Sequence, residues 1–181
     1  ITMTDRVMVD IGSSTGGFTD CALQNKAKRV YAVDVGTNQL VWKLRNDSRV
    51  VVKEKTNFRH ATTDLFEYEL PNIATIDVSF ISLKLIFEPL KDILIKPQFE
   101  AGREDVGKKG IVKDAKIHQR VIENVISYAN ECQFSIQNLT YSPITGGEGN
   151  IEFLAHFKVG GTNSLLQVEQ VVQEAHDCFK G

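Results

Sequence analysis

The sequence predicts an α/β fold whose sheet is mostly parallel and is closed by an antiparallel hairpin near its C-terminal end. We predict strands at residues 6–11 and 29–35. Residues 72–78 form a nearly continuous apolar run, as expected for a strand that is covered on both faces. Segments with helical spacing lie between these strands. Two last strand-like segments, 134–141 and 151–159, are joined by a turn that is short enough to make them antiparallel.

Other elements complete this pattern. We predict helices at 15–24, around Leu40, Val41 and Leu44, along Leu83, Ile86, Leu90 and Leu94, after the N-cap Asp114, and from Leu165 to Phe179, with a short strand at 49–52. One connection is too short. The helix that ends near Leu94 leaves almost no room before Pro97 for the next strand, which with its turn needs roughly 8–10 residues. Either the chain has lost that strand or residues of the natural protein are missing near positions 94–96; we favour missing residues.

Composition narrows the class of protein. The 181 residues suit one domain, and 42% hydrophobic with 24% charged residues can form a real core. A net charge of −2 excludes a strongly basic coat for nucleic acid, so any RNA contact must come from local patches or another domain. The three cysteines, Cys21, Cys132 and Cys178, are far apart, which argues against zinc and disulfides and favours a reducing cytoplasm. The sequence has no apolar run long enough to span a membrane.

A glycine-rich turn between two acids is the clearest functional pattern. Asp10 ends the first predicted strand, the segment Gly12-Ser-Ser-Thr-Gly-Gly17 follows it, and Asp34 ends the second strand. A carboxylate in the position of Asp34 can accept both hydroxyls of a ribose. A pyrophosphate would be repelled by Asp10 in the same poorly hydrated turn, and the glycine spacing is not that of a dinucleotide site. We therefore predict a cationic nucleoside without phosphate, S-adenosylmethionine; a tight turn without a ligand is the weaker alternative.

The predicted cofactor site extends beyond this turn. Asn57 and Phe58, after the third strand, resemble the adenine-side contact of this class, although a polar loop residue beside a core aromatic is an equally good interpretation. The predicted cofactor-binding residues are Asp10, Gly12, Ser13, Ser14, Gly16, Gly17, Phe18, Asp34, Val35, Asn57, Phe58 and Asp77. No metal site is predicted.

Three further residues suggest activation of a weak nucleophile. Asp77 ends the fourth strand, Lys96 lies in Lys-Pro-Gln-Phe-Glu100, and Glu152 begins the last strand. A ribose hydroxyl needs a base, and a desolvated lysine has a pKa low enough to serve. The two carboxylates would raise that pKa again, so orientation is the role that suits them. The alternatives are a helix cap for Asp77, a solvated lysine for Lys96 and an outward strand residue for Glu152.

Five long motifs, in the same order along nearly the whole chain, closely resemble the TlyA hemolysin family of FtsJ-like rRNA 2′-O-methyltransferases. They are Asp10-Ile-Gly-Ser-Ser-Thr-Gly-Gly-Phe-Thr-Asp20, Tyr31-Ala-Val-Asp-Val-Gly36, Ile76-Asp-Val-Ser-Phe-Ile-Ser-Leu83, Lys96-Pro-Gln-Phe-Glu-Ala-Gly-Arg103 and Gly149-Asn-Ile-Glu-Phe-Leu154. The resemblance implies a Rossmann-like class I methyltransferase fold, S-adenosylmethionine as methyl donor, and a cytidine ribose of ribosomal RNA as acceptor.

The same resemblance implies a Lys-Asp-Lys-Glu catalytic tetrad. Its last three members match Asp77, Lys96 and Glu152, whereas the first lysine lies upstream of the glycine loop and has no counterpart in residues 1–181. The N-terminal RNA-binding domain of the family has no counterpart either. We therefore expect a methyltransferase domain that binds cofactor and methylates poorly alone.

Two basic stretches are candidates for RNA contact. The better one follows Lys96 in a glycine-containing loop and contributes the predicted RNA-binding residues Arg103, Lys108, Lys109 and Lys113. The other spans residues 41–60, and a solvated loop is the alternative for both. Ribosomal RNA or ribosomal subunits are the predicted partners, membranes are not, and the oligomeric state is left open.

Three other functions compete with RNA methylation. The acceptor could be a small molecule or a protein, or the chain could bind cofactor without catalysis. A membrane-lytic role, which the hemolysin name suggests, has no physical support because the amphipathic helices have the spacing of core-packing helices.

Overall fold

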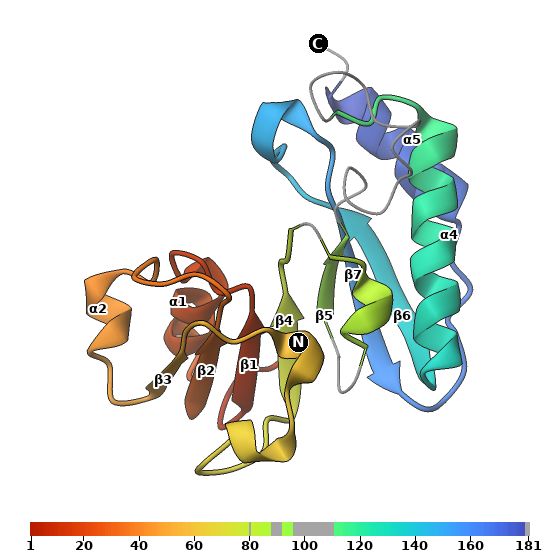
Figure 1. Cartoon of the computed structure of the whole chain (residues 1–181). Helices are drawn as coiled ribbons and strands as arrows, with labels where there is room; N and C mark the ends of the chain where they lie inside the picture. The colour runs from red at the N-terminus through yellow and green to blue at the C-terminus, as the bar shows by residue number, and fades with distance from the viewer. Residues whose placement is uncertain (80, 88–91, 96–110, 180–181) are drawn as a thin grey trace. The chain divides into compact units, whose positions relative to one another are not determined.

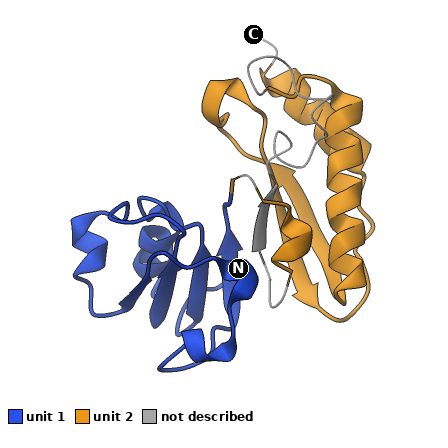
Figure 2. Cartoon of the chain, in the orientation of Figure 1, with its two compact units in different colours: residues 1–78 blue, residues 79–181 orange. Residues whose placement is uncertain are grey.

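The computed structural model describes residues 1–79, 81–87, 92–95 and 111–179 (Figure 1). The chain divides into two compact units, residues 1–78 and 79–181 (Figure 2). Each unit has its own sheet and its own helices, so each is described by itself.

Unit 1 is built on a four-stranded parallel sheet with the strand order β3-β2-β1-β4. Its strands are β1 (Val7–Ile11), β2 (Arg29–Val33), β3 (Val50–Lys53) and β4 (Ile73–Ile76). All five residues of β1 are buried, which explains its unbroken apolar run. The register places Asp10 opposite Ala32 on one side and Thr75 on the other.

Helices and 3-10 turns connect these strands. They are α1 (Gly17–Gln24), α2 (Trp42–Arg45), η1 (Phe58–His60) and η2 (Thr63–Leu65). Met8, Leu23, Val30, Leu40 and Leu44 belong to one buried core cluster between helices and sheet. The predicted helix around Leu40 is thus only the short α2. Of the three residues on which the prediction was based, Leu40 and Leu44 are buried, while Val41 is exposed.

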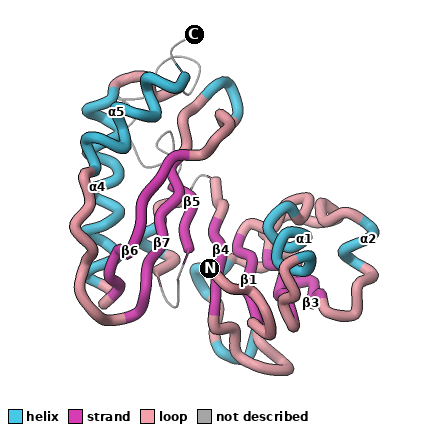
Figure 3. Tube along the Cα trace, turned by 180° about the vertical axis from the view of Figure 1, so that it is seen from behind, coloured by secondary structure: helices cyan, strands magenta, loops and turns pink. Residues whose placement is uncertain are grey.

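Unit 2 has a three-stranded antiparallel sheet with the order β5-β7-β6. The strands are β5 (Asp92–Ile95), β6 (Phe134–Tyr141) and β7 (Phe153–Val159). Helices α4 (Ala115–Glu131) and α5 (Val168–Phe179) pack against each other and contact β6 (Figure 3). Short 3-10 turns, η3 (Leu83–Leu85) and η4 (Gly147–Gly149), complete the unit. The predicted hairpin, the N-cap at Asp114 and the last two helices are confirmed.

A histidine pair joins the two long helices of unit 2. Nδ1 of His118 on α4 and Nε2 of His176 on α5 lie 2.8 Å apart and share a hydrogen bond. Burial, followed by the proximity of His176, lowers the pKa of His118 to about 4, while Asp114 acts in the opposite direction. His118 is therefore a neutral core residue near pH 7. This agrees with its contact with the ring of Phe153.

The prediction of a helix from Leu83 to Leu94 is wrong. Of the described residues at its start, Leu83–Leu85 form only the turn η3. Residues Asp92–Ile95 are the strand β5, which pairs with β7 from Asp92 opposite His156 to Ile95 opposite Phe153. Pairing with a long neighbouring strand outweighed the helical spacing of the apolar residues. The strand for which the sequence left no room before Pro97 is thus present as β5. Missing residues near positions 94–96 stay a prediction.

Candidate cofactor site and active site

The glycine loop after β1 is fixed by hydrogen bonds to β2. The backbone N–H groups of Gly12 and Ser13 both donate to the carbonyl oxygen of Val33, at 2.9 and 3.1 Å. Gly12 has φ +80°, and a Cβ at this position would collide with the carbonyl oxygen of Asp77. Only glycine meets both demands, because the left-handed conformation strains other residues and the backbone of residue 77 has no room to move.

The rest of the loop turns the chain into α1. Gly16 is the N-cap with φ +101°, and a Cβ there would meet the side chains of Leu40 and Leu44. Gly17 differs, because no atom outside its own neighbourhood lies within 4 Å of the Cβ position. Phe18 is half-buried and packs on the core cluster of unit 1. The contact of Phe18 with a cofactor stays a prediction.

Asp34 joins two loops at the carboxyl edge of the sheet. Its Oδ2 accepts a hydrogen bond from the backbone N–H of Ser14 at 2.8 Å, and its Oδ1 accepts one from Gly36 at 2.7 Å. A carboxylate has about four acceptor positions, so each oxygen keeps one for a further donor. A pair of vicinal hydroxyls, as on a ribose, is the ligand group that such a fixed pair of oxygens suits.

A third segment lies at the same edge. The backbone N–H of Thr56 donates to the carbonyl oxygen of Asp34 at 3.0 Å, and that of Lys55 donates to Gly36 at 3.2 Å. Asn57 caps η1 by accepting from the N–H of Arg59, which leaves its amide nitrogen for other partners. Val35 is 70% exposed, an unusual position for an apolar side chain beside a polar loop. The structure thus brings Ser14, the segment 34–36 and the segment 55–57 together.

Asp10 lies beneath this edge. Its carboxylate is 1% exposed and accepts hydrogen bonds from the hydroxyls of Thr19 at 2.6 Å and Thr75 at 3.0 Å. Burial raises the pKa of Asp10 to about 6, against the lowering effect of the two hydroxyls, and the nearby carboxylate of Asp77 raises it further. Asp10 therefore ties α1 and β4 to β1. Its contact with a cofactor stays a prediction.

Asp77 follows β4 directly. Its backbone N–H donates to the carbonyl oxygen of Ile11 at 3.0 Å, which extends the parallel pairing of β1 and β4 by one residue. Its own carbonyl oxygen faces Gly12, and its carboxylate is close enough to raise the pKa of Asp10. The end of β4 therefore meets the start of the glycine loop, as predicted for parallel strands.

Glu152 belongs to unit 2, just before β7. It is half-buried, and its carboxylate occupies the place where a Cβ on Gly146 would stand. Lys113 is exposed. The other predicted catalytic and RNA-binding residues, Lys96, Arg103, Lys108 and Lys109, lie outside the described residues. The catalytic grouping of Asp77, Lys96 and Glu152 stays a prediction.

The basic stretch at 41–60 is largely neutralised within unit 1. Arg45 pairs with Glu54, Arg49 with Asp47, Lys53 with Glu67, and Lys43 more loosely with Asp20 at 3.6 Å. Most of these cations therefore stabilise loops of the unit. Because of these ion pairs, the stretch has less positive charge available for RNA than its number of basic residues suggests.

Sequence reasoning missed the two threonines that hold Asp10. A hydroxyl in an otherwise apolar strand, as at position 75, indicates a buried polar partner. The hydroxyl at position 19, in a helix that faces that strand, indicates the same. It also missed Gly146, because only the folded loop brings that residue to Glu152. Trp42 was not singled out either.

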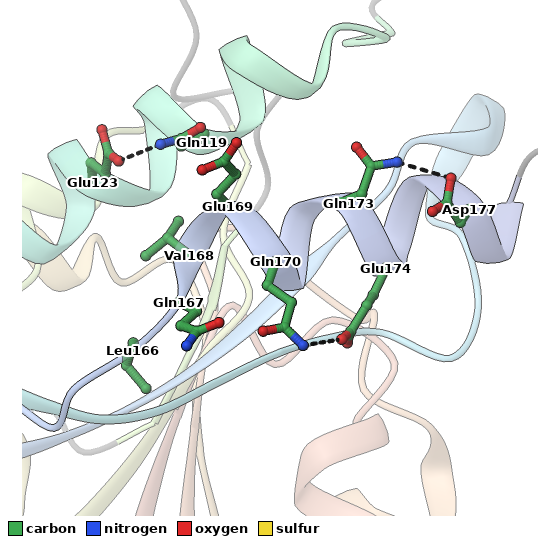
Figure 4. A pocket seen from close by; sticks show the side chains of 10 residues that line it. All are labelled: Gln119, Glu123, Leu166, Gln167, Val168, Glu169, Gln170, Gln173, Glu174 and Asp177. Carbon is green, nitrogen blue, oxygen red and sulfur yellow. Dashed lines mark hydrogen bonds between the residues drawn. The ribbon is translucent and has the colours of Figure 1, made fainter.

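A separate hollow lies on unit 2 along α4 and α5, with a volume of about 670 Å³ (Figure 4). Its wall consists of carboxamides, carboxylates and a few apolar side chains, namely Gln119, Glu123, Leu166, Gln167, Val168, Glu169, Gln170, Gln173, Glu174 and Asp177. Three glutamines donate to acids one helical turn away, at 2.8–2.9 Å. None of the predicted cofactor-binding residues lines it, and its acids give no reason to place a nucleoside there.

Comparison with known proteins decides the family. The model of the FtsJ-like methyltransferases matches residues 1–159. The chain belongs to the FtsJ-like methyltransferase family. It is 54% identical, over 195 aligned positions, to a Bacillus subtilis (strain 168) protein with the provisional name rRNA methyltransferase YqxC, covering 99% of this chain and 69% of that protein. It is also 40% identical over 162 positions to the 16S/23S rRNA (cytidine-2′-O)-methyltransferase TlyA of Mycobacterium tuberculosis (strain ATCC 25618 / H37Rv), covering 84% of this chain and 60% of that enzyme.

Solved structures agree with this FtsJ-like assignment. A protein of Streptococcus thermophilus, provisionally named a hemolysin, superposes with a TM-score of 0.94 at 50% identity, over 99% of this chain and 70% of its own. A Listeria monocytogenes protein provisionally named an S-adenosylmethionine-dependent methyltransferase shares the fold alone, with a TM-score of 0.63 at 15% identity over 89% of this chain and 94% of its own. The motif-based resemblance and the Rossmann-like fold are therefore confirmed.

Within the described part of this FtsJ-like chain, no helix is long and apolar enough to cross a membrane. Nor do the described His, Cys, Asp and Glu residues form a group of three or more that could hold a metal ion. All three cysteines are exposed and free.

Proposed function

We propose that this chain transfers the methyl group of S-adenosylmethionine to a ribose 2′-hydroxyl of ribosomal RNA, with a cytidine as the acceptor. The observation that carries the proposal is Asp34, whose two oxygens are fixed by Ser14 and Gly36 at the carboxyl edge of a parallel sheet. Family membership supports methyl transfer, and the name of the Mycobacterium tuberculosis relative supports the cytidine 2′-hydroxyl of rRNA. A reducing cytoplasm, where free exposed cysteines are stable, is the compartment we propose.

The residues present fit such a cofactor. Asp34 would accept the two ribose hydroxyls, and the exposed side chain of Val35 would pack on the adenine, with Asn57 next to it. Gly12 leaves the backbone bare where the ligand would approach the loop. The carboxylate of Asp77, which is close enough to raise the pKa of Asp10, would supply negative charge for the sulfonium group. When bound, the cofactor supplies an electrophilic methyl group.

The chain must then provide an acceptor oxygen and remove its proton. In the proposed step a bond forms between O2′ and the methyl carbon while the carbon–sulfur bond breaks, and the hydroxyl proton passes to Nζ of Lys96. The backbone of Asp77 is held by Ile11, and the carboxylate of Glu152 lies against Gly146; the two carboxylates would orient the lysine and the ribose. Holding the hydroxyl in line with the methyl group should contribute much of the rate acceleration.

The decisive experiment incubates the full-length protein with labelled S-adenosylmethionine and intact ribosomal subunits. The expected result is label in ribosomal RNA at a position that resists alkaline cleavage, because a 2′-O-methyl group blocks attack on the neighbouring phosphate. Changing Lys96 to Ala should abolish this label while calorimetry still detects cofactor binding. Label on a base, or transfer only to protein or small molecules, would contradict the proposed acceptor. Tight dinucleotide binding without S-adenosylmethionine binding would contradict the cofactor.

A further inference from the structure

Trp42 is the only tryptophan of the chain, and it is 78% exposed. Indole rings are normally well buried because they carry a large apolar surface, so this position needs an explanation. The preceding residue, Val41, is also 46% exposed, and the side chain of the next residue, Lys43, is 82% exposed. Two exposed apolar side chains and a cation thus follow one another in sequence at the start of α2. The ion pair of Lys43 with Asp20 is long, at 3.6 Å, and leaves the lysine largely exposed.

The backbone that carries Trp42 is firmly held. The N–H of Val41 donates to the carbonyl oxygen of Thr15 in the glycine loop at 3.2 Å, and the side chain of Asn46 donates to the carbonyl oxygen of Trp42 at 2.8 Å. Beneath it, Leu44 is buried against Gly16. The exposure of Trp42 is therefore not a consequence of a loose loop.

The same helix is anchored to the segments that surround Asp34. Arg45 of α2 forms an ion pair with Glu54, and Glu54 also accepts from the backbone N–H of Asn38 at 2.7 Å. One residue further on, Lys55 donates to Gly36. The helix that carries the indole is thus attached to the loops of the proposed cofactor site.

We propose that Trp42 is a stacking platform for an unpaired base of the RNA substrate, and that Lys43 contacts the adjoining phosphate. This inference rests on the proposed function, which requires single-stranded RNA near this edge. A flat aromatic face next to a cation is the combination that single-stranded nucleic acid uses, since every base has a π-face and every link a negative charge. A protein partner fits less well, because a stable interface buries about 800 Å² on each side, far more than one indole and one valine offer.

The single tryptophan makes the proposal directly measurable. Titrating the 181-residue chain with a short, cytidine-rich single-stranded RNA should quench its fluorescence, because the only indole stacks on a base. Trp42→Ala should weaken RNA affinity about 5- to 150-fold, the factor that corresponds to ~1–3 kcal/mol per stacked base, and Trp42→Phe should retain most of it. Tyr68→Ala, which removes another exposed aromatic side chain of unit 1, is the matched control and should leave affinity unchanged.

Four results would overturn the proposal: no RNA binding by the chain, RNA binding without quenching, equal RNA affinity of Trp42→Ala, and the same quenching by heparin, which has charge but no bases. The proposed function is tested separately by S-adenosylmethionine calorimetry and by methyl transfer to ribosomal subunits. If Trp42→Ala binds cofactor and methylates with unchanged KM, the stacking role fails and the proposed function stands. If the wild-type chain binds RNA through Trp42 but binds no S-adenosylmethionine, the stacking role stands and the proposed function fails.

Discussion

The carboxylate of Asp34 accepts a hydrogen bond from the backbone N–H of Ser14 at 2.8 Å, across 20 residues of sequence. This contact joins the loop after β2 to the glycine loop after β1. Since Gly36 binds the other oxygen, the orientation of the carboxylate is fixed before any ligand arrives. A preorganised acceptor of this kind binds hydroxyls without paying for its own ordering.

Removing this carboxylate should therefore weaken cofactor binding. We expect Asp34→Ala to lower S-adenosylmethionine affinity about 10- to 100-fold, because hydrogen bonds to a charged group contribute ~1.5–3 kcal/mol. Isothermal titration calorimetry measures the change. Asp64→Ala, which removes an exposed carboxylate from η2, is the control and should bind the cofactor like the wild type. Equal affinity of the Asp34 variant would show that the ribose lies elsewhere.

Two glycines of the same loop should respond oppositely to alanine. Gly12→Ala places a methyl group against the carbonyl oxygen of Asp77 at φ +80° and should lower the free energy of unfolding by at least about 2 kcal/mol. Gly17 lies in α1 with open space around its Cβ position, so Gly17→Ala should raise it by about 0.5–1 kcal/mol. Urea unfolding compares the two variants. A stable Gly12→Ala protein would mean that β4 moves away easily.

Asp10 should make stability depend on pH. Its pKa is about 6 in the fold against 3.8 for a free side chain, so the fold favours the protonated form. The contribution of protonated Asp10 to the free energy of unfolding is fully present below about pH 4 and is lost as the pH rises through about 6. Asp10→Asn cannot ionise, and its stability relative to wild type should increase over this window by up to about 3 kcal/mol.

Urea unfolding at several pH values between 4 and 7 tests this expectation. Asp77→Asn serves as a second variant, because removing the neighbouring carboxylate should lower the pKa of Asp10 and shift the transition to lower pH. A difference between Asp10→Asn and wild type that does not change with pH would refute the raised pKa.

The position of Glu152 should depend on a bare backbone at Gly146. A methyl group there would displace the carboxylate, so Gly146→Ala should reduce kcat for methylation of ribosomal subunits about 10- to 100-fold, as small misplacements of catalytic groups do. Cofactor affinity should be retained. Gly147→Ala adds the same methyl group where no atom lies within 4 Å, and it should remain active. If both variants are equally active, the conformation of Glu152 does not matter to the reaction.

Local pattern predicted most of unit 1. The strands β1, β2 and β4 are recognisable because each is an apolar run buried in a parallel sheet, and Asp34 follows from its distance to the glycine loop. The burial of Asp10 between two hydroxyls was not predictable in this way. It depends on the register that places Thr75 opposite residue 10, and register is a property of the assembled sheet.

Unit 2 was harder to predict for the same reason. The hairpin of β6 and β7 is local, with a short turn, and was predicted correctly. The strand β5 instead pairs with β7 from 60 residues away in sequence, and its apolar spacing suits a helix equally well until that partner is known.

The fold itself requires Gly16, independently of any ligand. Its glycine is required by φ +101° and by the side chains of Leu40 and Leu44, and both constraints act whether or not a nucleoside is present. A descendant that had become a pseudoenzyme would keep this residue simply to stay folded. Val35, whose exposed side chain adds little to the core, is under no such constraint from the fold.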